Sequence, residues 1–247
     1  MSARKNTAHA QKNHAAKKEI RFRSMSPSEK KRFYALAAAV VVVVAVLALW
    51  GLDAFPHRDG SLRVYKGEAQ AGEGAIVVKR GDRNNPRYYE IARVTNTVDG
   101  FARTEFSTHV TDTNVTDYWY EPVEPGDIFN YYICGIAQNA EEAYFASAEV
   151  HGLVKEDENG EGTYVENELR GTFADGRPYV GFTITMRDGD TYGSAWHRYL
   201  YAYFDVAEDS SVLIAVSDKQ ALQKNLSDDQ TLIEFLNKAY ACVEIEE

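Results

Sequence analysis

Twenty consecutive uncharged residues at 33–52 constrain this chain more than any other feature of its sequence. The run FYALAAAVVVVVAVLALWGL is almost entirely aliphatic. A helix of this length rises about 1.5 Å per residue and spans roughly 30 Å, the thickness of the hydrocarbon layer of a bilayer. Before it, Ser26-Pro27-Ser28-Glu29 has the pattern of a helix start, with Ser26 as N-cap and Glu29 closing a capping box. The sequence therefore predicts a transmembrane helix over 26–52 that contacts the lipid bilayer through residues 33–52.

The distribution of charge predicts how this helix crosses the membrane. Residues 1–32 carry ten Lys or Arg and two Glu, whereas residues 53–247 carry 17 basic and 35 acidic side chains. Basic residues beside a membrane span stay on the cytoplasmic side. We therefore expect an uncleaved signal-anchor in the plasma (cell) membrane, with the N-terminus in the cytoplasm and the C-terminal domain extracytoplasmic. A cleaved secretory signal is the alternative, but its apolar region is shorter, about 7 to 15 residues.

The chain divides into four predicted segments: a disordered basic cytoplasmic tail at 1–25, the transmembrane signal-anchor helix at 26–52, a linker at 53–61 and a β-rich extracytoplasmic domain at 62–247. The acidity of that last domain argues against a specific nucleic-acid partner, because like charges repel. Eight identities at an offset of 76 residues raise the possibility of a weak duplication of 62–138 in 139–216, followed by a helical segment at 217–247. One integrated domain is the favoured interpretation.

Short runs rich in Val, Ile, Thr, Tyr and Phe, separated by turn residues, predict a series of strands beyond the linker. The predicted strands are 62–66, 75–79, 88–95, 101–106, 118–121, 128–137, 143–154, 164–169, 179–186, 196–206 and 212–216. Strands in such a series, without intervening helices, indicate antiparallel pairing in a sandwich or barrel.

The C-terminal segment has a different pattern. Residues 218–225 could form a short helix, and Ser227-Asp228-Asp229-Gln230 predicts a capping box in front of a helix over 231–241. Four apolar residues of that helix share one face and need a surface to cover them, namely Leu232, Phe235, Leu236 and Ala239. We therefore expect a mainly antiparallel β domain, sandwich or barrel-like within the α+β class, closed by a C-terminal amphipathic helix.

Two cysteines, Cys134 and Cys242, allow one disulfide, which an extracytoplasmic location would permit. Cys134 falls in a strong predicted strand and Cys242 follows the last helix, so a bridge would fix that helix to the sheet. Two buried thiols are the alternative, and the sequence does not distinguish the two.

One loop has a partial metal-binding pattern. Asp157, Asn159, Glu161 and Glu168 occupy positions 1, 3, 5 and 12 of a calcium-binding loop of the EF-hand type, in which alternating oxygens wrap a hard cation. The pattern departs from that loop because Glu161 is long for its position, an aromatic residue replaces the usual aliphatic one, and no helix precedes Asp157. An acidic hairpin loop without a metal is therefore the favoured interpretation.

No pattern of a catalytic motif is present in the sequence. It has no HExxH, no GxSxG and no phosphate-binding GKS/T loop. His197 lies in a predicted strand and Ser194 three residues before it, so in an extended chain the two face opposite sides, while His109 and His151 lack the spacing of metal ligands. A catalytic set assembled from distant positions stays open, and no cofactor is expected.

The layout of basic tail, single anchor and acidic β-rich domain predicts a membrane-anchored extracytoplasmic binding or scaffolding module. We expect it to be an accessory component of a cell-envelope assembly whose partner is another envelope or membrane protein. Two alternatives stay open, an anchored extracytoplasmic hydrolase and a cation-dependent adhesion or sensor domain. The sequence favours binding over catalysis.

Overall fold

The computed structural model describes residues 26–51, 57–67, 70–81, 84–104, 117–124, 129–156, 163–187, 196–220 and 226–245. The chain separates into two compact units, Met1–Phe55 and Pro56–Glu247. The predicted tail at 1–25 and the predicted metal-loop residues Asp157, Asn159 and Glu161 lie outside the described residues.

The first unit contains helix α2 (Pro27–Gly51). Its start has the predicted capping box, since the backbone N–H of Ser26 donates to Glu29 Oε2 at 2.7 Å and that of Glu29 donates to Ser26 Oγ at 3.3 Å. Apolar side chains along the helix, among them Val41 and Val43, are exposed. Among the residues that the structure describes, no helix reaches the length and apolarity that a membrane span needs.

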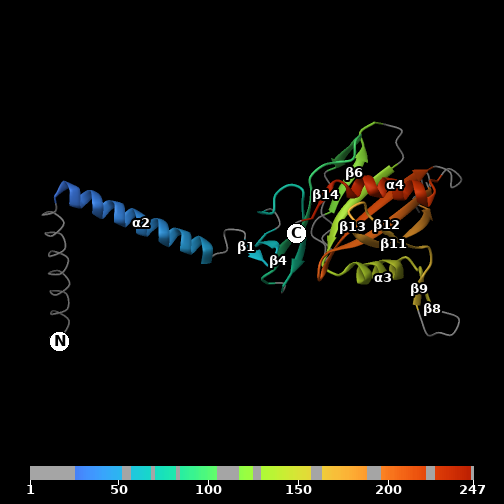
Figure 1. Cartoon of the computed structure of the whole chain (residues 1–247), viewed down its shortest axis with the longest axis horizontal. Helices are drawn as coiled ribbons and strands as arrows, with labels where there is room; N and C mark the ends of the chain where they lie inside the picture. The colour runs from blue at the N-terminus through green and yellow to red at the C-terminus, as the bar shows by residue number, and fades with distance from the viewer. Residues whose placement is uncertain are drawn as a thin grey trace, which may run out of the picture. The chain divides into compact units, whose positions relative to one another are not determined.

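The second unit is built on a seven-stranded sheet in which every neighbouring pair is antiparallel (Figure 1). In spatial order its strands are β10 (Glu168–Thr172), β11 (Pro178–Arg187), β12 (Trp196–Ala207), β13 (Ser210–Gln220), β7 (Phe129–Ile136), β6 (Asp117–Pro122) and β5 (Phe101–Thr104). This sheet confirms the prediction of a mainly antiparallel β domain.

A second, five-stranded sheet packs against the first. It contains β1 (His57–Asp59), β2 (Leu62–Tyr65), β3 (Ala75–Arg80), β4 (Arg87–Val94) and β14 (Val243–Glu244), and a separate hairpin contains β8 (Val154–Glu156) and β9 (Thr163–Val165). Close approach of the two sheets requires Gly135 on β7, because a Cβ there would lie 2.9 Å from Ile76 of β3. Strand β1 lies within the segment predicted as a linker, 53–61, and pairs with β2.

Both faces of the seven-stranded sheet carry buried residues. Alternate residues of a strand point to opposite sides, and the neighbours Leu213 and Ile214 are both buried. We call the side that carries Leu200 and Ile214 the α4 face, since it packs against the second sheet and the C-terminal helix. The opposite side carries Tyr203 and Leu213 and packs against α3 (Ala140–Val150), so we call it the α3 face.

Helix α4 (Asp229–Tyr240) confirms the predicted closing helix, since it packs on β12 and β13. All four residues of its predicted apolar face are buried: Leu232, Phe235, Leu236 and Ala239. Its N-cap is Asp228, which accepts from the backbone N–H of Thr231 at 2.8 Å. The predicted N-cap Ser227 is wrong by one residue, because its backbone N–H instead donates to the buried Asp218 at 2.6 Å.

The strand predicted at 143–154 is wrong, because most of this segment is helix α3. Asn139 caps the helix by accepting from the backbone N–H of Glu142 at 2.9 Å, and the sequence AEEAYFASAEV is rich in strong helix formers. The buried residues of α3 recur at helical spacing, namely Ala140, Ala143, Tyr144 and Ala148. Local helix signals therefore outweigh the β-propensity of its aromatic residues.

One further strand prediction and one helix prediction need correction. The strand predicted at 164–169 is interrupted at Asn167, whose φ of 59° turns the chain between β9 and β10. The short helix predicted at 218–225 is wrong at its start, because Asp218 continues β13 in register with Arg198 of β12. Cross-strand pairing thus extends β13 beyond the 212–216 core that its apolar residues alone predict.

Replacing Phe235 by alanine should destabilise the second unit strongly. The ring is 6 % exposed and packs against Phe101, Phe129 and Tyr131 at centroid distances of 5.2, 4.9 and 5.7 Å. Loss of such a ring typically costs about 3 to 5 kcal/mol. Denaturant unfolding of Phe235→Ala measures this, with exposed Lys238→Ala as the control expected to stay within about 0.5 kcal/mol. Equal stability of both variants would contradict a core role for α4.

Candidate binding site

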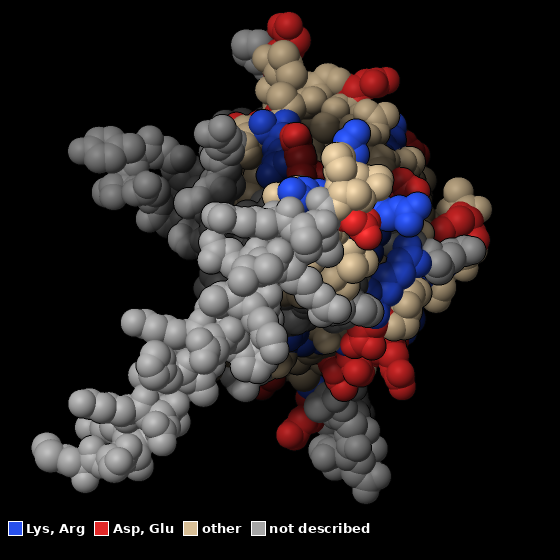
Figure 2. All heavy atoms as spheres, turned by 90° about the vertical axis from the view of Figure 1, so that its left-hand side faces the viewer, with Lys and Arg blue, Asp and Glu red and all other residues tan. Residues whose placement is uncertain are grey.

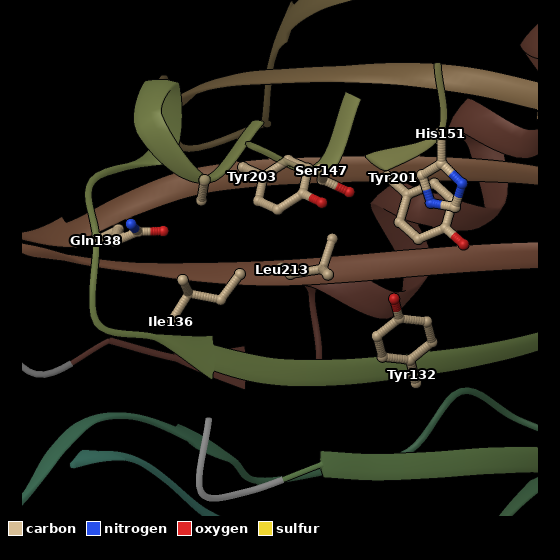
Figure 3. A pocket seen from close by; sticks show the side chains of 9 residues that line it. Tyr132, Ile136, Gln138, Ser147, His151, Tyr201, Tyr203 and Leu213 are labelled. Atoms are coloured by element: carbon tan, nitrogen blue, oxygen red, sulfur yellow. The ribbon is translucent and has the colours of Figure 1, made fainter. Parts of the chain in front are cut away.

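A pocket of about 310 Å³ lies between helix α3 and the α3 face of the large sheet (Figure 3). Helix α3 and its flanks contribute Gln138, Ala143, Ser147 and His151, and strands β7, β12 and β13 contribute Tyr132, Ile136, Tyr201, Tyr203 and Leu213. Ser147 and His151 are four residues apart and therefore lie on one side of the helix, one turn from each other.

A row of large side chains crosses the α3 face at the end of this pocket. Pairing of the strands places Trp119 of β6 beside Tyr132 of β7, then Ala215 of β13, then Tyr201 of β12 and Phe182 of β11. The ring pairs are close, with centroids 4.9 Å apart for Trp119 and Tyr132 and 6.4 Å apart for Tyr132 and Tyr201. Ala215 lies between Tyr132 and Tyr201 on the sheet, and because its side chain is small the two tyrosine rings can contact each other above it.

The row continues along β12 beyond the end of α3. The ring centroids of Tyr199 and Tyr201 are 5.9 Å apart. The His197 ring stacks on the Tyr199 ring, with a centroid distance of 5.5 Å and an angle of 4° between the ring planes. The hydroxyl of Tyr199 is also 3.1 Å from His197 Nδ1. These side chains, all half-buried, form what we call the aromatic strip: Trp119, Tyr132, Tyr201, Tyr199 and His197.

His151 closes the pocket at the C-terminal end of α3. Its ring packs 5.4 Å from that of Tyr201 and 5.7 Å from that of Phe182. Burial lowers the pKa of His151 from its ordinary value, because an apolar environment disfavours the charged imidazolium. At neutral pH the imidazole is therefore uncharged and offers one donor and one acceptor.

The tyrosines of the pocket are uncharged as well. Burial raises the pKa of Tyr201 to about 12 and also raises the pKa of Tyr203, whose hydroxyl shares a hydrogen bond with Ser147. None of the nine lining residues is an Asp, Glu, Lys or Arg. The pocket therefore combines aromatic walls with neutral hydroxyl, amide and imidazole groups.

The partial calcium loop is only in part within the described residues. Of its four candidates, Glu168 is described, and it pairs with Arg170, which also binds Glu141 at 2.5 Å. In the described part of the chain, no three His, Cys, Asp or Glu side chains lie close enough to hold a metal ion. Glu168 thus takes part in a surface ion-pair network, while the loop at 157–162 stays untested.

The two cysteines are thiols in this structure. Cys134 is buried on the α3 face together with Leu213, whereas Cys242 is buried in the cluster on the α4 face. The sheet separates the two clusters, so the possible disulfide between Cys134 and Cys242 is not formed. Burial also raises the pKa of the Cys242 thiol, which lowers its reactivity.

Sequence reasoning missed the pocket because it missed α3. Assigning 143–154 to a strand places Ser147 and His151 on one face but about 13 Å apart, at 3.3 Å per residue, instead of one helical turn apart. The signal was present in Asn139 and Glu142, a helix-capping residue type three positions before a glutamate. Of the other histidine and serine candidates, His109 and Ser194 lie outside the described residues.

Comparison with known proteins supplies no family for this arrangement. No protein family model matches the chain, and no curated protein matches it significantly.

Because burial lowers the folded-state pKa of His151, protonation of this ring disfavours folding. The unfolded state binds more protons between the two pKa values, so stability should fall as the pH drops below about 6.5, the ordinary histidine value. NMR titration of the ring should show a midpoint below that value. Thermal unfolding of His151→Gln should depend less on pH over the same range. A midpoint above 6.5 would contradict the buried position.

Proposed function

We propose that this protein is a membrane-anchored extracytoplasmic binding module, an accessory component of a cell-envelope assembly. Its membrane anchor is the apolar run at 33–52. Its binding surface is the aromatic strip, which contacts another envelope protein. The strip carries this proposal.

Support for the anchor comes from the sequence and from the exposure of its side chains. Twenty residues without a charge are flanked by Lys30, Lys31 and Arg32, and such basic flanks stay on the cytoplasmic side. Valines around α2 are exposed, Val41 to 66 % and Val44 to 59 %. Exposed aliphatic side chains of this density are unfavourable in water and favourable in hydrocarbon.

Support for binding comes from the composition of the strip. Tyr and Trp are the residue types enriched where protein partners dock, because they bury large apolar rings while their polar atoms still find partners. Flanking the strip on β11, Met186 is 38 % exposed and is in register with His197. An adaptable apolar side chain at the border of an aromatic surface is typical of interfaces.

Protease added to spheroplasts should remove the domain beyond residue 56 and leave a small N-terminal fragment. The reason is the basic cytoplasmic flank, which fixes the N-terminus inside. Immunoblotting with tags at both ends measures the result, and detergent lysis provides the control in which the N-terminal tag is also degraded. A C-terminal tag protected in intact spheroplasts would contradict the proposed orientation.

A photo-crosslinking side chain placed at Trp119 or Tyr199 should give a defined adduct with one envelope protein in the native membrane. Trp119 lies at one end of the strip and Tyr199 lies next to His197 at the other, so a partner bound to the strip should be captured from both positions. Position 150 on α3, where Val150 is 84 % exposed, is the matched control expected to give none. The substitution Met186→Glu should reduce the adduct from position 199 by about tenfold, since it buries a charge in the contact.

Equal labelling from position 150, or adducts with different proteins from positions 119 and 199, would contradict the proposed contact surface.

One observation favours a hydrolase as the second candidate. Ser147 and His151 share one side of α3 and both line the pocket, and the lowered pKa of His151 leaves its imidazole available as a base. Ser147 already shares a hydrogen bond with Tyr203, which favours binding over nucleophilic attack. Hydrolysis of a p-nitrophenyl ester that disappears in both Ser147→Ala and His151→Gln would support catalysis, and identical rates in all three proteins would exclude it for this pair.

A further inference from the structure

We propose that the pocket between α3 and the large sheet binds an uncharged saccharide unit. This assignment deepens the proposed binding role, since the pocket shares Tyr132 and Tyr201 with the aromatic strip. It names the chemistry of a second ligand, separate from the protein partner on the strip.

Charge is the first argument. Among the described residues, no Asp, Glu, Lys or Arg lines the pocket, so a charged ligand would lose its hydration without gaining a counter-charge from them. The surrounding domain is strongly acidic, with 35 acidic and 17 basic side chains in residues 53–247, and it repels anionic polymers at longer range. The ligand that costs least to transfer into this pocket is a neutral one.

The walls are the second argument. The rings of Tyr132, Tyr201 and His151 and the side chain of Leu213 present flat or apolar surfaces, against which the C–H faces of a sugar ring pack well. The volume of about 310 Å³ is at the lower end of the range for small-molecule sites, about 300 to 1,000 Å³. It accommodates one sugar ring and part of a second, which would extend over the strip.

The third argument is the arrangement of the polar groups, which are distributed along the length of the pocket. Figure 3 shows the Gln138 amide at one end, the hydroxyls of Ser147 and Tyr203 in the middle, and His151 with the hydroxyls of Tyr132 and Tyr201 at the other end. Each hydroxyl can both donate and accept a hydrogen bond. The amide offers an NH₂ donor and an oxygen acceptor, and the neutral imidazole has one donor nitrogen and one acceptor nitrogen. A saccharide carries hydroxyls around its ring and can pair with such a distributed set.

A pure hydrocarbon ligand fits these observations less well. It would pack against Leu213 and Ile136 but would offer no hydrogen bond to the Tyr201 hydroxyl or to the Gln138 amide. An unpaired polar group that becomes buried costs about 1 to 3 kcal/mol. The number of polar groups therefore selects a hydroxylated ligand over an apolar one.

The test is calorimetric titration of the full chain, purified in a detergent without sugar head groups. The probes are N,N′-diacetylchitobiose, which is neutral, and the same dimer without its acetyl groups, which is cationic at pH 6. We expect saturable binding of the neutral dimer with a Kd in the millimolar range or tighter. Binding of the cationic dimer should be at least tenfold weaker.

Variants identify the site. Gln138→Ala removes an exposed amide and Tyr201→Ala removes a wall, and each should weaken binding of the neutral dimer by about tenfold. Val150→Ala on the same helix, outside the pocket, should leave affinity unchanged. Gln138 is exposed, so its variant keeps the test valid even where Tyr201→Ala does not fold. No saturable binding, tighter binding of the cationic dimer, or unchanged affinity in Gln138→Ala would overturn the assignment.

The two proposals fail separately. A strip that crosslinks to an envelope protein while the neutral dimer does not bind would overturn the saccharide assignment and leave the proposed partner contact standing. Saturable binding of the dimer without an adduct from positions 119 and 199 would overturn the proposed partner contact and leave the saccharide assignment standing.

Discussion

The pairing of β13 with β7 is the interaction on which the rest of this domain depends. It places Leu213 beside Cys134, 79 positions away in the chain, and so joins two separate meanders into one sheet. It also places Ile214 on one face and Leu213 on the other. Because both faces of this central pair are buried, each needs its own cover. The second sheet with α4 covers one face, and α3 covers the other.

Much of this fold could be predicted from local pattern. Short runs of β-branched and aromatic residues between turn residues predicted most of the strands. The spacing of Leu232, Phe235, Leu236 and Ala239 predicted the buried face of α4. Strand order could not be predicted, because β7 pairs with β13 through contacts that no local signal encodes. The pocket was missed for a related reason. Its residues come from three strands and from a helix whose aromatic side chains resemble those of a strand.

The weak repeat at an offset of 76 residues stays a prediction, and the topology limits what it can mean. Two meanders each lead into a helix, β5, β6 and β7 into α3, and β11, β12 and β13 into α4. A two-fold axis that exchanges two neighbouring antiparallel strands, such as β7 and β13, is perpendicular to the sheet. Rotation about this axis keeps each side chain on the same face of the sheet. Yet α3 and α4 cover opposite faces. The two meanders, taken with the helices that follow them, are therefore not related by a simple rotation. The predicted repeat of 62–138 in 139–216 does not include α4 and stays untested.

The site exists because α3 is shorter than the strands beneath it. Its 11 residues extend about 16 Å at 1.5 Å per residue, whereas the 12 residues of β12 extend about 40 Å at 3.3 Å per residue. Helix α3 ends at its C-cap His151, whose ring packs against Tyr201. Strand β12 extends beyond this point and carries Tyr199 and His197. Aliphatic side chains at these half-buried positions would expose apolar surface to water. Tyr and His are tolerated there because the ring can be buried while a polar atom stays in contact with water. The short helix and the amphipathic rings beyond it together leave a surface suited to binding.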